Sequence, residues 1–245
     1  MRKIVWFSCG AASAVSAKLA LNEGSAEIVY CDTGSEHPDN KRFLKDCEKW
    51  FGQKVIILKN EKYSDIWEVF NKTKWLVGPS GARCTTELKK KMRQNYERPD
   101  DIHVFGYTLE EIDRAERFSK NNFELKTQWN LIENNLNKND CLALIERAGI
   151  ELPVLYKLGY DHNNCLGCVK GQSGYWNKIR IDFIDVFNRM AKVERQLNVA
   201  INKTYEKGER KRIFLDELDP KAGNYKNEPD ISCSLFCHAV SEQIK

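Results

Sequence analysis

The stretch SCGAAS, residues 8 to 13, combines small residues with two hydroxyl side chains directly after a hydrophobic run. Gly10 lacks side-chain bulk, and Ser8 and Ser13 flank it at a spacing that can turn hydroxyls and backbone N–H groups toward one anion. A helix that follows would add its positive end to the attraction for a phosphate. A tight turn that only folds the chain back after a strand fits the same residues, so both interpretations stay open.

Two further stretches carry side chains whose types suit a bound nucleotide. In CDTG, Asp32 can reach a ribose or a metal ion, and Gly34 lets an adenine ring approach the backbone. In RCTTELK, Arg83 and Thr85 stand at the expected start of a helix, and Lys89 follows about one turn later. Unpaired N–H groups and cations at such a helix start attract anions. Each of these stretches also has a structural explanation.

The stretch GYTLEEIDRA follows an expected strand and opens an expected helix. Gly106 is the first residue of this stretch, and Glu111 and Arg114 are one helical turn apart. This spacing suits an ion pair within the helix as well as a contact with a ligand.

The cysteines of the second half predict a metal site. Nine cysteines are many for a chain in a reducing compartment, which favours metal or thiol chemistry over disulfides. Cys165 and Cys168 form a C-x-x-C pair, and Cys233 and Cys237 form a C-x-x-x-C pair. Four thiolates from two short loops suit zinc or a 4Fe–4S cluster. Buried structural cysteines are the alternative. Because His238 follows Cys237, this thiol is also a candidate nucleophile beside a base.

The hydrophobic periodicity places these stretches on a repeating pattern of strands and helices. Strands are predicted at residues 3–8, 27–31, 54–58 and 102–106, and helices at 12–22, 40–51, 64–71, 85–96 and from about 109. This alternation predicts an α/β fold, Rossmann-like, with a doubly wound and mostly parallel sheet. Such sheets bind ligands outside the carboxyl ends of their strands, where the loops 8–13, 32–34 and 106–108 fall. We therefore expect these three loops to form one site.

Taken in order, SCGAAS, CDTG, RCTTELK, GYTLEEIDRA and LPVLYKLGYDHNNCLGC resemble the phosphoadenosine phosphosulfate (PAPS) reductase family of the PP-loop, adenine nucleotide alpha-hydrolase-like superfamily. The resemblance covers residues 1 to about 180. It implies a domain that binds an adenine nucleotide, ATP or PAPS, with the phosphates on the loop of residues 8–13. The implied cofactor-binding residues are Asp32 and Gly34 at the nucleoside, Thr85 with Arg83 and Lys89 at the phosphate or sulfate end, and Gly106, Glu111 and Arg114, which match the family's glycine, acidic and arginine positions.

The resemblance also divides the chain. Residues 1–150 are expected to form the nucleotide-binding domain, and residues 151–245 a helical, cysteine-containing extension packed on it. A long amphipathic helix is predicted over residues 182–202, because Phe183, Phe187, Met190 and Leu197 recur at helical spacing. A loop with prolines and a glycine then returns the chain to Cys233.

Two departures from the family bear on the chemistry. Ala11 and Ala12 stand where ATP-cleaving PP-loop enzymes carry a lysine and an aspartate, so cleavage needs charge from Arg83, Lys89 or a magnesium ion. The tail ISCSLFCHAV matches only in part the Glu-Cys-Gly-x-His end of PAPS reductases, whose cysteine attacks the sulfate; its counterpart is Cys237. The catalytic candidates are therefore Arg83, Lys89 and Cys237.

These observations favour an enzyme that acts at a nucleotide α-phosphate or in sulfur transfer or reduction. A nucleotide-binding module without turnover and a zinc-stapled structural protein are the alternatives. The net charge of +4 is a small bias that does not indicate a dedicated DNA-binding protein. Two basic stretches, at residues 89–93 and 207–212, leave nucleic acid as a candidate partner, beside a protein that donates sulfur or electrons. Solvated faces explain these stretches too.

The apolar runs are too short for a membrane span, and the run before Gly10 is too short for a secretory signal. The sequence therefore predicts a cytoplasmic protein without a membrane partner.

Overall fold

The structure, a computed structural model, describes residues 1–78, 81–206, 209–229 and 231. Contacts within the chain group it into two compact units. Unit 1 consists of Met1–Asp32, Glu36–Asn60 and Lys91–Asn164, and unit 2 of Thr33–Ser35, Glu61–Lys90 and Cys165–Lys245. The chain passes from one unit to the other several times. The division at residue 150 that the sequence suggests stays a prediction.

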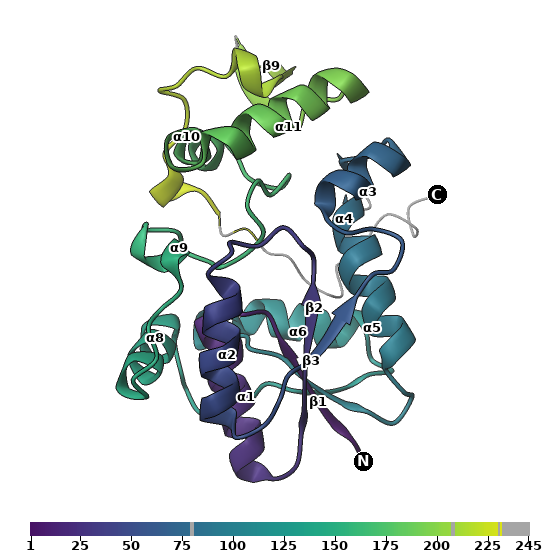
Figure 1. Cartoon of the computed structure of the whole chain (residues 1–245), viewed down its shortest axis with the longest axis vertical. Helices are drawn as coiled ribbons and strands as arrows, with labels where there is room; N and C mark the ends of the chain where they lie inside the picture. Colours follow the sequence, from purple (N-terminus) through teal and green to yellow (C-terminus); the bar gives the residue numbers. More distant parts are fainter. Residues whose placement is uncertain (79–80, 207–208, 230, 232–245) are drawn as a thin grey trace. The chain divides into compact units, whose positions relative to one another are not determined.

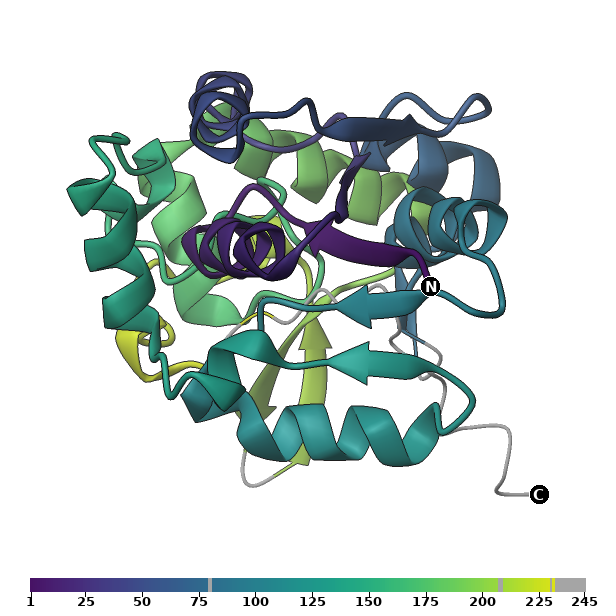
Figure 2. The same cartoon turned by 90° about the horizontal axis from the view of Figure 1, so that it is seen from below.

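Unit 1 is built on a five-stranded sheet in the order β3-β2-β1-β6-β7. Its strands are β1 (Lys3–Phe7), β2 (Glu27–Asp32), β3 (Ile56–Lys59), β6 (Ile102–Val104) and β7 (Lys126–Gln128). Figure 1 shows β1, β2 and β3 side by side, and Figure 2 shows β1, in purple, beside the teal arrows of β6 and β7, all pointing the same way. Every neighbouring pair is parallel. The predicted Rossmann-like α/β fold is therefore confirmed.

Helices cover both faces of this sheet, as crossover connections between parallel strands require. They are α1 (Ala11–Glu23), α2 (Asn40–Phe51), α5 (Lys91–Tyr96), α6 (Ile112–Asn121), α7 (Asn130–Glu133), α8 (Lys138–Arg147) and α9 (Val154–Lys157), with a 3-10 turn, η2 (Leu109–Glu111), before α6.

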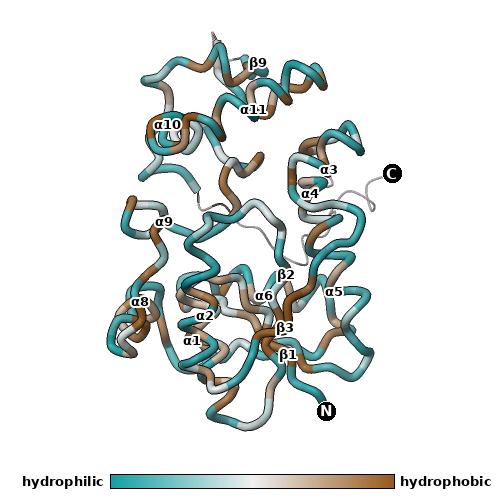
Figure 3. Tube along the Cα trace, viewed as in Figure 1, coloured by the Kyte–Doolittle hydropathy of each residue, from teal (hydrophilic) through white to brown (hydrophobic). Residues whose placement is uncertain are grey.

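The larger core lies on the face that α1, α2 and α8 cover. Val5 and Phe7 of β1 point into it, and Phe43 of α2 is fully buried there. The ring of Phe7 lies 6.5 Å from that of Phe43 and 5.8 Å from that of Phe51. Figure 3 shows the hydrophobic residues gathered on the strands β1 and β3. Burial of these aromatic side chains supplies most of the driving force for packing α2 on the sheet.

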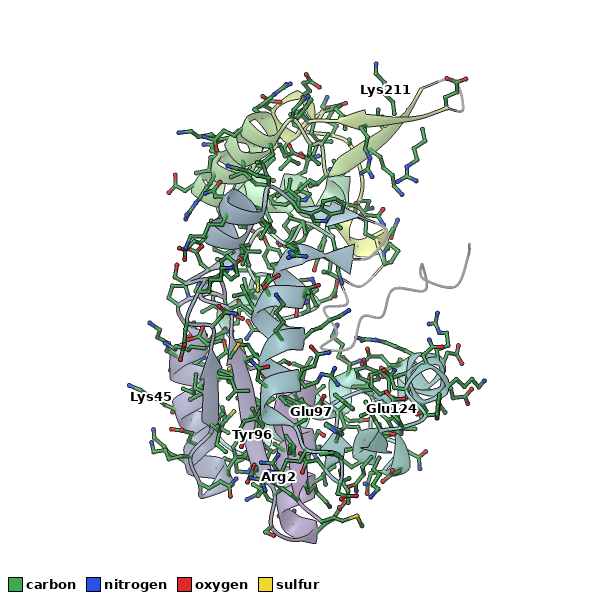
Figure 4. All side chains as sticks on the ribbon, turned by 90° about the vertical axis from the view of Figure 1, so that its right-hand side faces the viewer. Arg2, Lys45, Tyr96, Glu97, Glu124 and Lys211 are labelled. Carbon is green, nitrogen blue, oxygen red and sulfur yellow. The ribbon has the colours of Figure 1, made fainter. Side chains whose placement is uncertain are left out.

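The other face of the sheet carries the side chains that alternate with this core. Trp6 contacts Tyr96 of α5 edge to face, with ring centroids 6.4 Å apart. At the amino end of the sheet, Arg2 donates to Asp101 at 2.9 Å, and the Tyr96 hydroxyl donates to Glu27 at 2.7 Å. Figure 4 labels Arg2 and Tyr96 in this cluster. Burial, more than the Glu27 carboxylate, raises the pKa of Tyr96 to about 12. The cluster therefore pairs the polar groups at the amino end of the sheet with one another.

His103 of β6 is buried on the same face and makes the folding of unit 1 sensitive to acid. Its Nδ1 accepts a hydrogen bond from Trp6 Nε1 at 3.0 Å, and burial lowers the pKa of its ring from 6.5 to about 4. Between these values the unfolded chain binds a proton that the folded chain does not, so stability falls as the pH is lowered from 6.5 to 4. We expect His103→Gln, whose amide oxygen can still accept from Trp6, to remove up to about 3 kcal/mol of this pH dependence.

Denaturant unfolding at pH 6.5 and 4.5 measures this effect. His37→Gln, which changes a half-buried histidine of unit 1, is the control for removing one imidazole elsewhere in the unit. Equal pH dependence in wild type and His103→Gln would contradict the assignment.

Unit 2 contains helices and two short antiparallel strand pairs. Its elements are α3 (Ile66–Thr73), β4 (Val77–Gly78), β5 (Gly81–Ala82), α4 (Arg83–Thr85), the π-helical turn η1 (Thr86–Lys90), α10 (Ser173–Asp182), α11 (Ile184–Leu197), β8 (Asn202–Glu206), β9 (Glu209–Ile213), and the 3-10 turns η3 (Leu215–Glu217) and η4 (Tyr225–Asn227). No helix among the described residues is long and apolar enough to cross a membrane.

The predicted helix over residues 182–202 is wrong at its carboxyl end. The helix α11 stops at Leu197, because Asn198 takes a left-handed conformation with φ 52°. Residues 202–206 then pair with residues 209–213 as the hairpin β8–β9. Glu194 fixes the base of this hairpin: its fully buried carboxylate accepts the N–H groups of Ile201 at 2.6 Å and of Leu215 at 2.7 Å.

Candidate functional site

The loop between β1 and α1 is a tight turn shaped by Cys9 and Gly10. Cys9 has a φ of 57°, in the left-handed region, and its side chain is fully buried. Gly10 has an extended backbone and precedes α1 without a side-chain cap hydrogen bond. The first N–H groups of a helix have no partner within the helix, and they lie at its positive end. This backbone geometry suits the binding of an anion.

The two serine hydroxyls of the loop bond the loop itself. Ser13 Oγ donates to the Gly10 carbonyl at 2.9 Å and accepts from the Ser8 N–H at 3.0 Å. Ser8 Oγ lies 3.1 Å from Ser13 Oγ and is the donor of this bond, because the Ser13 proton is already directed to Gly10. Ser13 is buried and Ser8 is exposed. The Ser13 hydroxyl is therefore used to hold the shape of the loop.

Gly106 brings the loop after β6 against the start of α1. A Cβ at this position would lie 2.6 Å from Ser13 Cα and 2.7 Å from Ser13 N, closer than real Cβ atoms approach. Because these are backbone atoms of a helix, only glycine fits here without a shift of the chain. The strand order of the sheet reverses between the neighbours β1 and β6. Two of the predicted loops thus meet at the topological switch point, where α/β sheets bind ligands.

Tyr156, which the sequence analysis did not single out, contacts the same loop from α9. Its hydroxyl accepts the N–H of Ala11, the first residue of α1, at 3.3 Å. A Cβ on Gly10 would lie 3.2 Å from this hydroxyl. The turn that carries Tyr156 is anchored to α2, because the Val154 N–H donates to Asp39 Oδ2 at 3.0 Å. A polar atom therefore occupies the amino end of α1.

Asn163 also holds the loop in place, and the sequence analysis did not single it out either. Its Nδ2 donates to the Cys9 carbonyl at 2.6 Å and to Asn40 Oδ1 at 2.8 Å, and the residue is buried. Both Tyr156 and Asn163 belong to the stretch LPVLYKLGYDHNN, which has no clear periodicity. Their place just before the C-x-x-C pair was the one signal that could have marked them.

Glu111, the last residue of η2, and Arg114, in the first turn of α6, form the ion pair that their spacing suits. Glu111 Oε2 accepts the Thr108 N–H at 3.2 Å in a capping box, and its other oxygen pairs with Arg114. The Arg114 guanidinium lies 4.1 Å from the centre of the Tyr107 ring, and that ring stacks on Trp129 at 5.1 Å. Both charged side chains are partly exposed. Their role toward a ligand stays a prediction.

Asp32 and Gly34 stand at a point where the chain passes from unit 1 to unit 2. Asp32 ends β2 and forms an ion pair with Lys59 of β3 at 3.1 Å. Gly34 has a φ of 65°, and a Cβ there would lie 2.0 Å from the carbonyl oxygen of Ser64. The structure itself therefore requires glycine at position 34, whatever the nucleoside requires.

In unit 2, the turn that holds Cys165 and Cys168 packs on the segment Thr33–Ser35. The Leu166 N–H donates to the Ser35 carbonyl at 2.9 Å, and Thr33 Oγ1 lies 3.0 Å from Cys165 Sγ. Gly167 has a φ of 73°, and a Cβ there would lie 2.8 Å from a methyl carbon of Val186. Glycine therefore allows a tight turn that brings both thiols to one loop.

Hydrogen bonds connect Cys168 through Tyr175 to Glu228, a residue that precedes the second cysteine pair in the sequence. The Cys168 N–H donates to the hydroxyl of Tyr175 at 3.0 Å, and Tyr175 is buried in α10. The carboxylate of Glu228 in turn accepts the N–H groups of Gly174 and Tyr175, the latter at 2.9 Å. Residue 228 is thus held at the amino end of α10, close in sequence to Cys233.

The four predicted metal ligands are only half described. Cys165 and Cys168 form no disulfide with another described residue, and Cys233 and Cys237 lie outside the described residues. No group of three or more metal-binding side chains occurs among the residues that the structure describes. Burial raises the pKa of Cys141 to about 12, which keeps that thiol protonated and marks it as a core residue.

Arg83, Thr85 and Lys89 lie on the helical turns α4 and η1 of unit 2. Arg83 Nη2 pairs with Glu87 Oε1 at 2.8 Å, whereas Arg83 Nε is buried with no hydrogen-bond partner in the described part of the chain. Thr85 is buried, and Lys89 is partly exposed. The turn η1 is π-helical, a conformation found mostly as single turns and frequently at functional sites.

The predicted site residues thus divide between the two units, each described by itself. Unit 1 carries Ser8, Gly10, Ser13, Asp32, Gly106, Glu111 and Arg114, and unit 2 carries Gly34, Arg83, Thr85, Lys89, Cys165 and Cys168. Within unit 1, the structure brings Ser8, Gly10, Ser13 and Gly106 together.

Comparison with known proteins identifies the family. Residues 2–173 match the family described as the phosphoadenosine phosphosulfate reductase domain. The chain is 28% identical over 207 residues to the uncharacterized protein MJ0066 of Methanocaldococcus jannaschii, which covers 79% of this chain and 41% of that protein. It is 24% identical over 238 residues to MJ0973 of the same organism, which covers 90% of this chain and 53% of that protein. The chain therefore spans about half the length of these relatives. It belongs to the phosphoadenosine phosphosulfate reductase family, a PP-loop family that binds adenine nucleotides.

Proposed function

We propose that the chain is an enzyme that binds ATP or a PAPS-type nucleotide and acts at its α-phosphate or in sulfur transfer or reduction. The phosphates lie on the loop of residues 8–13. The observation that carries this proposal is the approach of Gly106 to the backbone of Ser13, 2.6 Å from a Cβ at position 106 to Ser13 Cα. Because of this close approach, backbone atoms line the switch point between β1 and β6 at the positive end of α1. Such a backbone surface favours the binding of a phosphate group.

The charge on the phosphates needs partners from outside this loop. Residues 8–13 contain no lysine or arginine. We assign this role to Arg83 and Lys89, together with a magnesium ion. The Nε group of Arg83, which has no hydrogen-bond partner among the described residues, supports the assignment because a guanidinium can bind two phosphate oxygens at once. Both cations would stabilise the charge that develops on a leaving phosphate or sulfite.

The remaining ligand contacts follow from the family and stay part of the proposal. Asp32 and Gly34 flank the nucleoside, Thr85 contacts the phosphate or sulfate end, and Glu111 with Arg114 lies beside Gly106. Arg114 would have to exchange part of its pairing with Glu111 for a ligand oxygen.

The cysteines form the second part of the proposal: Cys165, Cys168, Cys233 and Cys237 hold a 4Fe–4S cluster or a zinc ion. Two cysteine side chains on the tight turn at Gly167 fit such a group. Chain length fits as well, because Glu228 is bound to Tyr175 N, and five further residues can span about 17 Å. A cluster would supply electrons for reduction, and a zinc ion would stabilise the fold of unit 2.

Cys237 is both a candidate metal ligand and the candidate nucleophile. The metal content of the purified protein distinguishes these two roles.

Calorimetry with ATP and with PAPS, followed by product analysis, tests the proposal. Release of AMP and pyrophosphate from ATP with magnesium would identify α-phosphate chemistry. Release of sulfite and adenosine 3′,5′-bisphosphate from PAPS, with a dithiol oxidised to its disulfide, would identify reduction. Stoichiometric binding without turnover would favour a binding module, and the absence of nucleotide binding would overturn the proposal.

Tyr156 is expected to compete with the phosphates. Its hydroxyl accepts the Ala11 N–H at the place where a phosphate oxygen would bind. In Tyr156→Phe this N–H is left for the nucleotide, so we expect the Kd for ATP to fall by about threefold to tenfold, the worth of one hydrogen bond. Calorimetry measures the change. Tyr160→Phe, which removes a hydroxyl from the same segment, is the control; weaker binding by Tyr156→Phe would instead make this hydroxyl a ligand of the phosphate.

A further inference from the structure

The hairpin β8–β9 of unit 2 is a ribbon with an excess of exposed cations. Its register pairs Lys203 with Arg212 and Thr204 with Lys211. Arg210, Lys211 and Arg212 are exposed, and Lys203 is partly exposed. Lys211 projects from the ribbon in Figure 4. The cations therefore lie on a surface that a large partner can reach.

One face of the ribbon gathers three of these cations at short range. Residues that are directly opposite in an antiparallel pair share a face, so Lys203 and Arg212 are neighbours with Cβ atoms about 5 Å apart. Arg210, two residues from Arg212, lies on the same face. Like charges directly opposite each other destabilise a strand pair. This arrangement is unfavourable for the hairpin alone, and an anion bound to the face would relieve it.

The described part of the chain does not neutralise this face. It contains no carboxylate within ion-pairing distance of Lys203, Arg210 or Arg212. The nearby carboxylates of Asp216 and Glu217 are bound to Arg195, at 2.7 and 2.6 Å. The Arg212 guanidinium donates to the Ile201 carbonyl at 3.1 Å, and this bond orients the side chain without offsetting its charge.

The base of the ribbon is rigidly held, which makes the cations a preorganised group. The buried Glu194 carboxylate binds the N–H groups of Ile201 and Leu215, the residues that flank the two strands. Both strands of the ribbon are thereby fixed to α11 at the base. A fixed group of cations loses less entropy on binding a polyanion than a flexible tail does.

We propose that the face formed by Lys203, Arg210 and Arg212 binds the phosphate backbone of a nucleic acid. Two arginines can each hold two phosphate oxygens, and a two-stranded ribbon fits the major groove of a B-form duplex. A membrane-binding element would carry exposed apolar side chains to insert among lipids. The described side chains exposed on the ribbon are charged instead. The proposal does not depend on the nucleotide site.

Fluorescence anisotropy of labelled 25-base-pair DNA and RNA duplexes with the full chain tests this proposal. The variant Lys203→Gln, Arg210→Gln and Arg212→Gln removes three charges from the face. The charge-matched control removes three exposed lysines elsewhere, by Lys49→Gln, Lys54→Gln and Lys120→Gln. We expect the ribbon variant to raise the Kd more than about tenfold and to lower the slope of log K against log salt by about 2 to 3, and the control to change the Kd less than about twofold.

A second variant separates charge from geometry. Arg210→Lys with Arg212→Lys keeps all the charge and is expected to retain part of the affinity. Equal weakening by the ribbon variant and the control would overturn the proposal, because it would reflect net charge alone. Binding to vesicles with 30% phosphatidylserine but to neither duplex would overturn it in favour of a membrane. A circular dichroism spectrum equal to that of wild type establishes that the variants fold.

Discussion

Gly106→Ala is expected to raise the Kd for ATP by about thirtyfold or more. The new Cβ would lie 2.6 Å from Ser13 Cα and 3.0 Å from the carbonyl carbon of Ala12. Neither atom belongs to a flexible side chain, so the loop after β6 and the start of α1 must move apart. An overpacked site of this kind costs about 2 kcal/mol, and here the distortion falls on the groups that hold the phosphates. Calorimetric titration with ATP measures the loss.

A second glycine of unit 1 provides the control for this experiment. Gly52 caps α2 with a φ of 74°, and nothing lies within 4 Å of a Cβ there. Gly52→Ala is expected to lower the stability by about 1 kcal/mol through backbone strain and to leave the Kd for ATP unchanged. Unchanged binding by Gly106→Ala would contradict the placement of the phosphates at the switch point. Equal loss in both variants would show that instability, and not the local clash, weakens binding.

Cys168→Ser is expected to remove the metal. Protein purified without oxygen should carry either iron with sulfide, seen as a broad visible absorption band, or about one zinc ion per chain. The serine variant keeps the N–H that donates to Tyr175 but loses a thiolate ligand, so the metal content should fall about tenfold or more. Metal analysis and the absorption spectrum measure this result, and a lower melting temperature should accompany it.

Cys84→Ser is the matched control, because Cys84 is a partly exposed cysteine outside the four-cysteine set. Its metal content should equal that of wild type. Wild-type protein without metal, or equal metal loss in both variants, would contradict the four-cysteine site and would leave Cys165 and Cys168 as packing residues of unit 2.

The sequence predicted the sheet well where strands are apolar runs. β1, β2 and β6 each contain buried residues from such a run, and the strands alternate with helices along the chain. β3 is also an apolar run, but its side chains are only half-buried or exposed at the edge of the sheet. β7 was missed, because it has only the three residues Lys126–Gln128 and no hydrophobic side chain among them. The hairpin β8–β9 was missed for a similar reason: its polar residues have no apolar alternation, and its base is held by the carboxylate of Glu194, which the sequence does not mark.

The candidate site could be predicted only where local sequence determines it. Gly106 was singled out, but the reason for a glycine, its distance to Ser13, depends on how two strands pair. The spacing of Glu111 and Arg114 correctly allowed an ion pair within a helix. Tyr156 and Asn163 reach the loop across more than 140 residues of chain, and only the tertiary fold brings them there.

The central claim is that the loop of residues 8–13 holds the phosphates, and the amide resonances of this loop test it most directly. In ¹⁵N-labelled protein titrated with ATP and magnesium, we predict shifts and slowed hydrogen exchange at the N–H groups of Gly10, Ala11, Ala12 and Ser13. Adenosine without phosphates should leave these four resonances in place. Saturable ATP binding that moves resonances elsewhere and none of these four would contradict the account.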